Sequence, residues 1–208
     1  MSRSSDESRP GYEIVIPHDP TRGKLTAVRN VVIQSSLAQL QANGFYERYA
    51  KLIASDVLDQ LRSDLSPGWI PIELALAHYQ ACEDLRLSIS EITALGLRVG
   101  DRLQETSLVS PAKKLRDAGV DLWAEVKALQ RMRERLYNGG SGQIVKIGPK
   151  EMLVEYRGFV LSRFHYHRHA QIAVLRAAYS SVGARITQLK AVHYSEPRDE
   201  VTYRVCWL

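Results

Sequence analysis

The chain has 208 residues, of which 45% are hydrophobic, and a formal net charge of +5. That is enough apolar material for the core of one large domain or two small ones. It contains no run of eighteen apolar residues, and its first ten residues, MSRSSDESRP, have no apolar stretch, so we expect neither a membrane span nor a secretory signal.

Two cysteines, Cys82 and Cys206, are the only thiols of the chain. They lie too far apart in sequence for a CxxC motif, and two cysteines do not make a disulfide framework. We therefore expect a reduced, cytoplasmic protein with two buried thiols.

Helical patterns fill the first two-thirds of the chain. Residues 1–20 are expected to form a flexible N-terminal segment, in which 12–16 could add an edge strand, and residues 21–208 a single domain. Within that domain the spacing of apolar residues predicts helices over 28–40, 46–53, from 55 onward, 71–82, 88–103, 110–119 and 121–136. Two glycines, Gly44 and Gly119, can end the first and the sixth of these helices. Ser88-Ile89-Ser90-Glu91 is a capping box at the start of the fifth.

After Asn138-Gly139-Gly140-Ser141-Gly142 the apolar period changes from 3.6 to 2. This change predicts strands at 144–147 and 152–156, a helix over about 162–185, and a hairpin of strands at 186–194 and 201–207. The chain therefore reads as a mainly helical part followed by a β-β-α-β-β unit, in one α+β domain.

Basic residues concentrate between Lys127 and Arg168, where nine of them stand against three acidic residues. A local field of this kind favours an acidic partner, whether a protein, a nucleic acid or a lipid headgroup. We predict a partner-binding face made of Lys127, Arg131, Arg133, Arg135, Lys150 and Arg157. The alternative is an ordinary charged, solvent-exposed helix face.

Three histidines, His165, His167 and His169, alternate in the segment FHYHRHA. On a helix, residues two apart point to nearly opposite sides, so His167 cannot share a metal ion with the other two. Zinc requires three or four ligands, and no neighbouring cysteine or carboxylate supplies them. An extended segment would bring all three to one side, but the helix is the preferred interpretation, and no metal site is assigned.

Catalytic patterns are absent from the sequence, which has no GxSxG, Walker or GxGxxG motif. His78 and Cys82, one helical turn apart, could form a thiolate–imidazolium pair, but an apolar helix favours core residues. Asp101 and Glu105 are interpreted as a solvated pair. We therefore expect no enzyme, no catalytic residue, no bound metal and no cofactor.

The segment GWIPIELALAHYQACEDLRLSISEI, from Gly68 to Ile92, resembles a family of uncharacterised myxobacterial proteins of about two hundred residues. The resemblance rests on Trp69, Pro71, Tyr79, Ala81, Cys82 and Asp84, and continues through LYNGG, IGPKE and YRVCW. It implies family membership but no activity. In this segment we expect Pro71 to open a helix, Trp69 to pack under it, and Tyr79 with Cys82 to continue a buried stripe.

The β-β-α-β-β part is also similar to haem-NO-binding domains, vinyl-reductase-like sensory domains and subunits of the TRAPP vesicle-tethering complex. This resemblance implies helices packed on one twisted antiparallel sheet, with a cavity for an apolar ligand between them. Haem-binding members carry a helix histidine and a Tyr-x-Ser-x-Arg clamp. Here Tyr179 and Ser181 match in type, but Arg185 stands two positions too late. The paired cysteines of some vinyl-reductase-like members are reduced to Cys206, so no zinc or iron–sulfur role is assigned.

Together these observations predict a non-enzymatic sensory or scaffolding module of bacterial signalling. It would bind an acidic protein partner and a small apolar ligand, and a homodimer is a further alternative. Nucleic-acid binding through residues 127–168 is the second function considered, and a haem or metal sensor the third.

Overall fold

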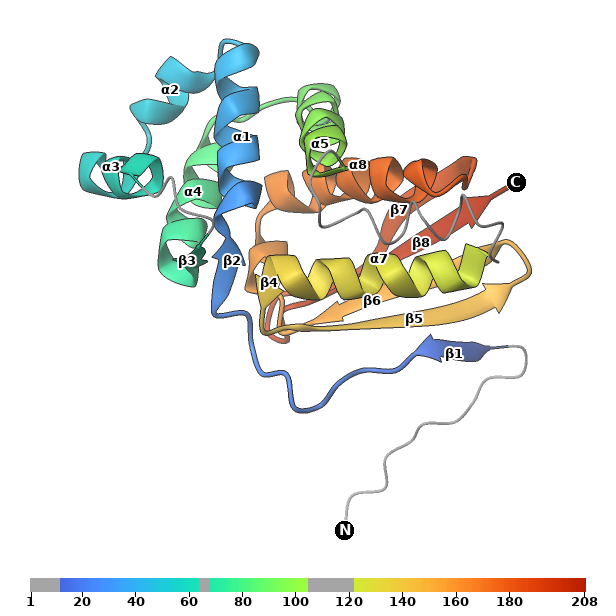
Figure 1. Ribbon diagram of the computed structural model, residues 1–208. Helices are drawn as coiled ribbons and strands as arrows, with labels where there is room; N and C mark the ends of the chain where they lie inside the picture. Colours follow the sequence, from blue (N-terminus) through green and yellow to red (C-terminus); the bar gives the residue numbers. More distant parts are fainter. Residues whose placement is uncertain (1–11, 64–67, 105–121) are drawn as a thin grey trace.

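The computed structural model describes residues 12–63, 68–104 and 122–208. It is an α+β structure in which a group of helices stands beside and over an antiparallel sheet (Figure 1). This confirms the predicted fold class. None of the helices in these three ranges is long and apolar enough to cross a membrane.

The main sheet has five strands in the order β1-β5-β6-β8-β7, and every neighbouring pair is antiparallel. Its strands are β1 (Glu13–Ile16), β5 (Ser141–Gly148), β6 (Glu151–Arg157), β7 (Ile186–Ser195) and β8 (Glu200–Trp207). With α8 (His165–Ser181) between the two hairpins, the predicted β-β-α-β-β order is confirmed.

The edge strand β1 pairs with β5, with Glu13 opposite Lys146. This confirms the edge strand expected at 12–16, so residues 13–16 belong to the sheet although they fall in the segment otherwise expected to be flexible. Residues 1–11 of that segment lie outside the described residues.

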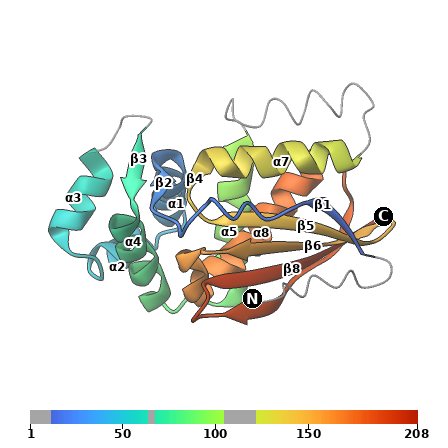
Figure 2. The same ribbon diagram turned by 90° about the horizontal axis from the view of Figure 1, so that it is seen from below.

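One face of the main sheet is buried and the other is partly open. Met152, Val154 and Tyr156 of β6 are buried, whereas the alternating Leu153 and Glu155 are partly exposed, as the period of two requires. Two helices, α7 (Leu122–Leu136) and α8, cover the buried face. Figure 2 shows α7 lying along the sheet.

The N-terminal helices form a second group at the end of the sheet (Figures 1 and 2). They are α1 (Asn30–Ala42), α2 (Tyr46–Ala50), α3 (Ser55–Ser63) and α4 (Ile72–Asp84). A small antiparallel sheet connects this group to the rest, because β2 (Ala27–Arg29) pairs with both β3 (Trp69–Pro71) and β4 (Tyr137–Asn138). None of these three short strands was predicted.

Helix α5 (Ile89–Gln104) packs directly on α8. Two glycines make this contact close: a Cβ atom on Gly96 would lie 2.6 Å from the carbonyl oxygen of Ala170, and one on Gly100 would lie 2.7 Å from the Cβ of Ala177. The backbones of α5 and α8 therefore touch, and no side chain separates them at these points.

The helix boundaries agree in part with the sequence patterns. The capping box is confirmed, since Ser88 N–H donates to Glu91 Oε2 at 2.8 Å and Glu91 N–H donates to Ser88 Oγ at 3.3 Å. Gly44 follows α1 with φ of 76°. Pro71 was expected to be the first residue of a helix. It ends β3 instead, and α4 begins at the next residue, Ile72. The expected helix over 110–119 lies outside the described residues, as does residue 121 at the start of the last helix expected before the strands.

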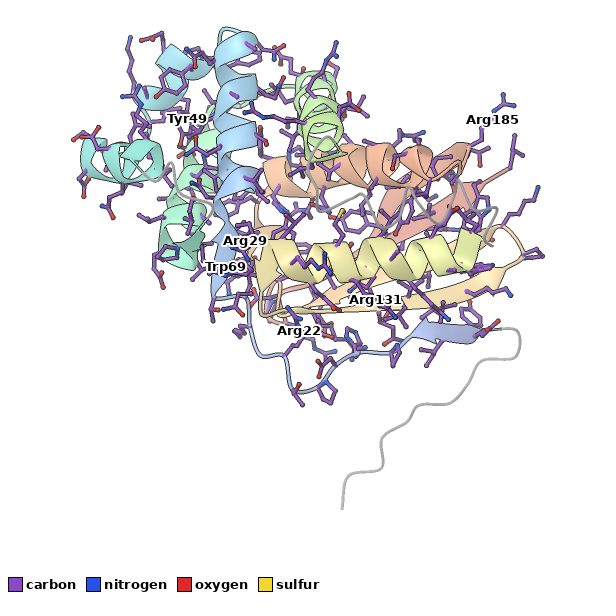
Figure 3. The ribbon with its side chains drawn as sticks, viewed as in Figure 1. Arg22, Arg29, Tyr49, Trp69, Arg131 and Arg185 are labelled. Atoms are coloured by element: carbon purple, nitrogen blue, oxygen red, sulfur yellow. The ribbon has the colours of Figure 1, made fainter. Side chains whose placement is uncertain are left out.

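Trp69 was expected to be buried under the helix, but it is exposed. Its exposed fraction is 38%, and it lies in β3 with the guanidinium of Arg29 over its ring (Figure 3). A three-residue strand holds Trp69 outside the helix that Pro71 precedes, so the ring cannot pack under that helix. Tyr79 and Cys82, by contrast, are buried as predicted. Cys206 is only partly buried, so the expectation of two buried thiols is wrong for this one, because its side chain alternates with the buried Val205 and Trp207 of the last strand.

Candidate ligand site

The predicted basic residues do not form one surface. Lys127, Arg131 and Arg135 are exposed along α7 at intervals of four residues, as expected (Figure 3 labels Arg131). Lys150 and Arg157 are exposed too, but they flank β6 at opposite ends, about 20 Å apart for a strand of this length. The three residues of α7, here called the α7 basic stripe, are what remains of the predicted face.

Arg133 does not belong to that face. It is only 5% exposed, so its assignment to a partner-binding surface is wrong. The reason is visible in the spacing of the buried residues of α7: Val126, Leu129, Arg133 and Leu136 follow one another at steps of three and four. Arg133 therefore stands on the stripe that turns toward the sheet.

The guanidinium of Arg133 lies among aromatic rings. Its central carbon is 4.1 Å from the ring centre of Tyr156, 4.8 Å from that of Phe159 and 5.4 Å from that of Tyr137. All three of its nitrogen atoms are buried without a hydrogen-bond partner among the described residues. Ring faces attract a cation but accept no conventional hydrogen bond. The hydroxyl of Tyr156 lies near enough to Arg133 to oppose the rise in the pKa of Tyr156, but one hydroxyl can satisfy only a small part of the five N–H donors, so most of them remain unused.

Arg133 and the surrounding tyrosines shift each other's pKa values. Burial lowers the pKa of Arg133, and the nearby phenols of Tyr156 and Tyr137 oppose that shift. Burial raises the pKa of Tyr137 to about 12, while the positive charge of Arg133 acts in the opposite direction. Arginine has the highest pKa of the side chains, and it therefore stays charged inside this box of rings.

Arg133 lines an interior cavity, here called the α7 cavity, between α5, α7, α8 and β6. The cavity measures about 50 Å³, where one water molecule occupies about 10–15 Å³. Its described walls are mainly apolar, and the polar groups on them are Gln130, Arg133, Gln171 and three tyrosines. The apolar lining comprises Leu103, Leu129, Met132, Leu136, Val174, Leu175 and Ala178, with Gly100 at the α5 side.

A second, smaller cavity of about 30 Å³ adjoins it. The two share Leu103, Tyr137, Gln171 and Val174 as lining residues, so these side chains form the partition between them. His167 lines only the smaller cavity.

The histidine segment has the geometry that a helix requires. The rings of His165 and His169 lie together, with centroids 4.3 Å apart, at the surface end of α8. His167 points the other way, is 2% exposed, and meets the ring of Tyr79 edge-on at 4.9 Å. Burial lowers the pKa of His167 to about 3, which keeps its imidazole neutral. Among the described residues, no group of three or more potential metal ligands gathers here or elsewhere.

His78 and Cys82 are core residues, as the apolar pattern of their helix predicted. The imidazole is fully enclosed, with Nδ1 2.9 Å from Tyr49 Oη and Nε2 3.0 Å from Ser36 Oγ. Burial lowers the pKa of His78 to about 3 and raises the pKa of the Cys82 thiol. A neutral imidazole beside a protonated thiol is the opposite of an activated thiolate pair.

Comparison with known proteins identifies the fold. No protein-family model matches the sequence, and no curated protein does. Among solved structures, a variant of an H-NOX protein from K. algicida in the unliganded Fe(II) state superposes with a TM-score of 0.59 at 10% identity, over 86% of this chain and 96% of that one. An oxygen-binding H-NOX domain related to soluble guanylate cyclases gives 0.56 at 8% identity, over 86% and 94%.

The chain therefore has the fold of H-NOX domains, which confirms the resemblance to haem-NO-binding domains at the level of architecture. The resemblance to vinyl-reductase-like domains and TRAPP subunits stays a prediction. The resemblance to a myxobacterial family stays a prediction.

Haem is the group that this fold implies, and the residues present do not fit it. Helix α7, which borders the α7 cavity, has no histidine, and the only described histidine that lines either of these two cavities is His167, held between Tyr79 and Phe159. The two cavities have room for a few water molecules each, far less than a macrocycle needs. The contact of α5 with α8 at Gly96 and Gly100 leaves no slot between these helices.

Arg185, which stands two positions too late in the sequence for the clamp, lines neither cavity. Arg185 is exposed beyond the end of α8 (Figure 3), whereas Tyr179 is buried on the cavity wall. The sequence did contain a signal for the buried position of Arg133. This arginine occurs at the three- and four-residue spacing of the buried apolar residues of α7. The chain therefore shares the architecture of H-NOX domains but places a buried arginine, without a histidine on α7, beside its internal cavity.

Proposed function

We propose that this protein is a sensory ligand-binding module that takes a small, mainly apolar molecule into the α7 cavity and transmits its presence to a partner. The observation that carries this proposal is the interior cavity where α5, α7, α8 and β6 meet, with apolar walls and a few convergent polar groups. This combination is the usual composition of small-molecule sites in proteins.

Helix α7 would transmit the signal, because one of its faces contacts the cavity and the other faces solvent. Leu129, Met132 and Arg133 line the cavity, while the α7 basic stripe faces outward. If α7 can take two positions relative to the sheet, a ligand that binds more tightly to one of these conformations shifts the equilibrium toward it. The size of the shift is set by the difference between the two affinities. The shift would change how the α7 basic stripe is presented to an acidic protein surface.

A binding role is also supported by the state of the buried polar groups. His78 and Cys82 are held in their unreactive forms, as described above. The charged groups that do reach the surface of α7 are suited to recognition. We therefore propose recognition, without catalysis, as the output.

The cavity can be tested by filling it. Val174 lines both cavities, so Val174→Phe should occupy the space without adding charge. We expect the protein, purified without denaturation and examined by native mass spectrometry and solvent extraction, to carry or to accept one equivalent of a small apolar compound. The Val174→Phe variant should bind none while unfolding within a few degrees of wild type. No bound compound, and no shift of the melting temperature with any of a panel of apolar compounds, would refute the proposal.

The surface can be tested separately. Arg131→Glu with Arg135→Glu should leave ligand binding and the melting temperature unchanged and remove partner capture. Lys150→Glu, in the distant β5–β6 turn, is the matched control and should retain capture. Retention by the double variant and loss by Lys150→Glu would move the partner surface away from α7.

A further inference from the structure

A buried arginine without a counterion is a costly feature for a folded protein. The 5% exposure of Arg133 removes it from water, and none of its nitrogen atoms has a hydrogen-bond partner among the described residues. Charged groups that are buried in proteins are normally paired or hydrogen-bonded, because desolvation of an isolated ion is strongly unfavourable. The aromatic rings offset only part of that penalty.

The described acidic residues do not supply the missing charge. Glu134, the next residue, is the only acid that acts on the pKa of Arg133, and its side chain leaves α7 on another side. Glu125 is buried on the same helix but lies eight residues away, about 12 Å along the axis. Arg22 adds a second positive charge nearby, and its own guanidinium donates to the carbonyl oxygens of Gly140 and Tyr137.

The position of the unused donors points into the α7 cavity. Arg133 is one of its lining residues, together with the side chains of Gln130 and Gln171, and Gln130 Nε2 also has no hydrogen-bond partner among the described residues. The amide nitrogen of Gln130 lies against Gly142 of β5, which does not line the cavity, so the unused donors at this apolar space are those of Arg133. An acceptor that arrives with a ligand would satisfy them.

We propose that the ligand of the α7 cavity is a small monocarboxylic acid, bound as its anion. This inference rests on the proposed function, since it names the class of molecule that the cavity takes. The carboxylate would accept the forked hydrogen bonds of Arg133. The compact apolar body would lie against Leu129, Val174 and Ala178.

Charge and size select a monocarboxylate over other anions. One guanidinium balances one negative charge, and a phosphate ester would bring nearly two charges into a site with a single unused cation. The cavity of about 50 Å³ has room for only a few water-sized groups, so it suits a carboxylate with a very short apolar chain.

The box of Tyr137, Tyr156 and Phe159 restricts how the guanidinium can turn. Its hydrogen-bonding fork is therefore held in place before the ligand arrives, which limits the entropy lost on binding. Binding would also neutralise the buried charge of α7, which connects ligand recognition to the position of that helix.

The experiment compares acids with their neutral amides. Acetate and propionate are titrated against acetamide and propionamide by calorimetry and by thermal melting at neutral pH. We expect the acids to raise the melting temperature of the wild type and to bind at least ten-fold more tightly than the amides. Arg133→Met should abolish this preference and, without ligand, melt at or above the wild-type temperature, because it removes an unpaired buried charge.

Two further variants make the result specific. Arg131→Met changes an exposed arginine of the same helix and should behave as wild type. Arg133→Lys keeps the charge but loses the fork, so it should bind the acids about ten-fold more weakly than wild type. It also keeps the test decisive if Arg133→Met does not fold.

The outcomes separate the two proposals. If acids and amides bind equally well, the α7 cavity is a ligand site but its ligand is not an acid, and this inference is overturned. If the preference for acids persists in both Arg133 variants, the inference is again overturned. If no compound binds and Val174→Phe changes nothing, the proposed function fails with it.

Discussion

The guanidinium carbon of Arg29 lies 4.3 Å above the ring centre of Trp69, and the two residues are opposite each other in the β2–β3 pair. Arg29 Nε also donates to the carbonyl oxygen of Arg135, at the end of α7. This contact links the small sheet to α7 at the surface, where Trp69 is 38% exposed.

Trp69→Ala should therefore lower the free energy of unfolding only modestly. Exposed cation–π contacts contribute about 0.5–1 kcal/mol, whereas a buried tryptophan contributes about 3–5 kcal/mol. Urea denaturation of the variant measures the difference, with Tyr79→Ala, at a fully packed position, as the strongly destabilised reference. A loss as large for Trp69→Ala as for Tyr79→Ala would show that the ring is buried in solution.

Gly96→Ala should destabilise the protein although alanine is the better helix former. The gain in helix propensity is about 1 kcal/mol, but the new Cβ would lie 2.6 Å from a backbone oxygen of α8. Overpacking of this kind costs about 1–3 kcal/mol and pushes α5 away from α8. Gly23→Ala, where no atom lies within 4 Å of the added carbon, is the control and should be close to neutral. Stabilisation by Gly96→Ala would mean that the two helices are further apart.

Stability should fall as the pH drops below about 6.5. Burial lowers the pKa of both His78 and His167 to about 3 in the folded state, so between these values the unfolded chain binds more protons. Each such histidine makes the free energy of unfolding decrease by roughly 1.4 kcal/mol per pH unit in that range. The stability that they provide is complete above pH 6.5 and is lost toward pH 3.

The measurement is urea denaturation at pH 7 and at pH 4.5. His167→Gln should reduce the dependence on pH, whatever its effect at pH 7, because one titrating group is removed. His193→Gln, on the exposed strand β7, is the control and should keep the wild-type dependence. Equal dependence in wild type and His167→Gln would show that His167 is accessible to protons in the folded state.

Haem should not bind in a defined complex. The protein as purified is expected to show no Soret band, and added haemin should give no saturable axial complex, since α7 has no histidine and the cavities are small. Absorption spectroscopy with titration measures this. One equivalent of haem that is lost in His167→Ala or His169→Ala would contradict the expectation and restore the haem sensor.

Nucleic acid should bind only weakly and without sequence preference. The α7 basic stripe offers three phosphate contacts, which predicts that the logarithm of affinity falls with a slope of about −3 against the logarithm of salt concentration. Labelled DNA and RNA titrated at two salt concentrations, with Arg131→Glu as the matched variant, test this. Tight binding near physiological salt would favour the nucleic-acid function over the protein partner.

The elements that the sequence predicted well are those with a long, regular pattern. The alternation of Met152, Val154 and Tyr156, and that of Val201, Tyr203 and Val205, fixes which face of each strand is buried, and the structure has them so. The strands β2, β3 and β4 have two or three residues each, too few to show any period. Their pairing depends on contacts between segments far apart in the chain, which no local pattern contains.

The candidate site was missed for a related reason. Arginine is almost always exposed, so Arg133 was counted with its exposed neighbours Arg131 and Arg135. Its burial is decided by Tyr156 and Phe159, which reach it only once β6 lies under α7. Spacing alone could have placed Arg133 with Val126 and Leu129, but only the tertiary structure supplies the cavity.

The position of β2 between β3 and β4 has a consequence for how the chain folds during its synthesis. Thr26 donates its backbone N–H to the carbonyl oxygen of Asn138, 112 positions later. Val28 of β2 pairs with Tyr137 of β4. The helices α1 to α4 can therefore leave the ribosome and begin to pack, but the strand at their base keeps an open edge until β4 has been made. Closing so long a loop is slow, and an open strand edge can pair with another chain. We expect nascent chains that end before β4 to need protection against aggregation, and full-length chains to lose that need as the third strand is added.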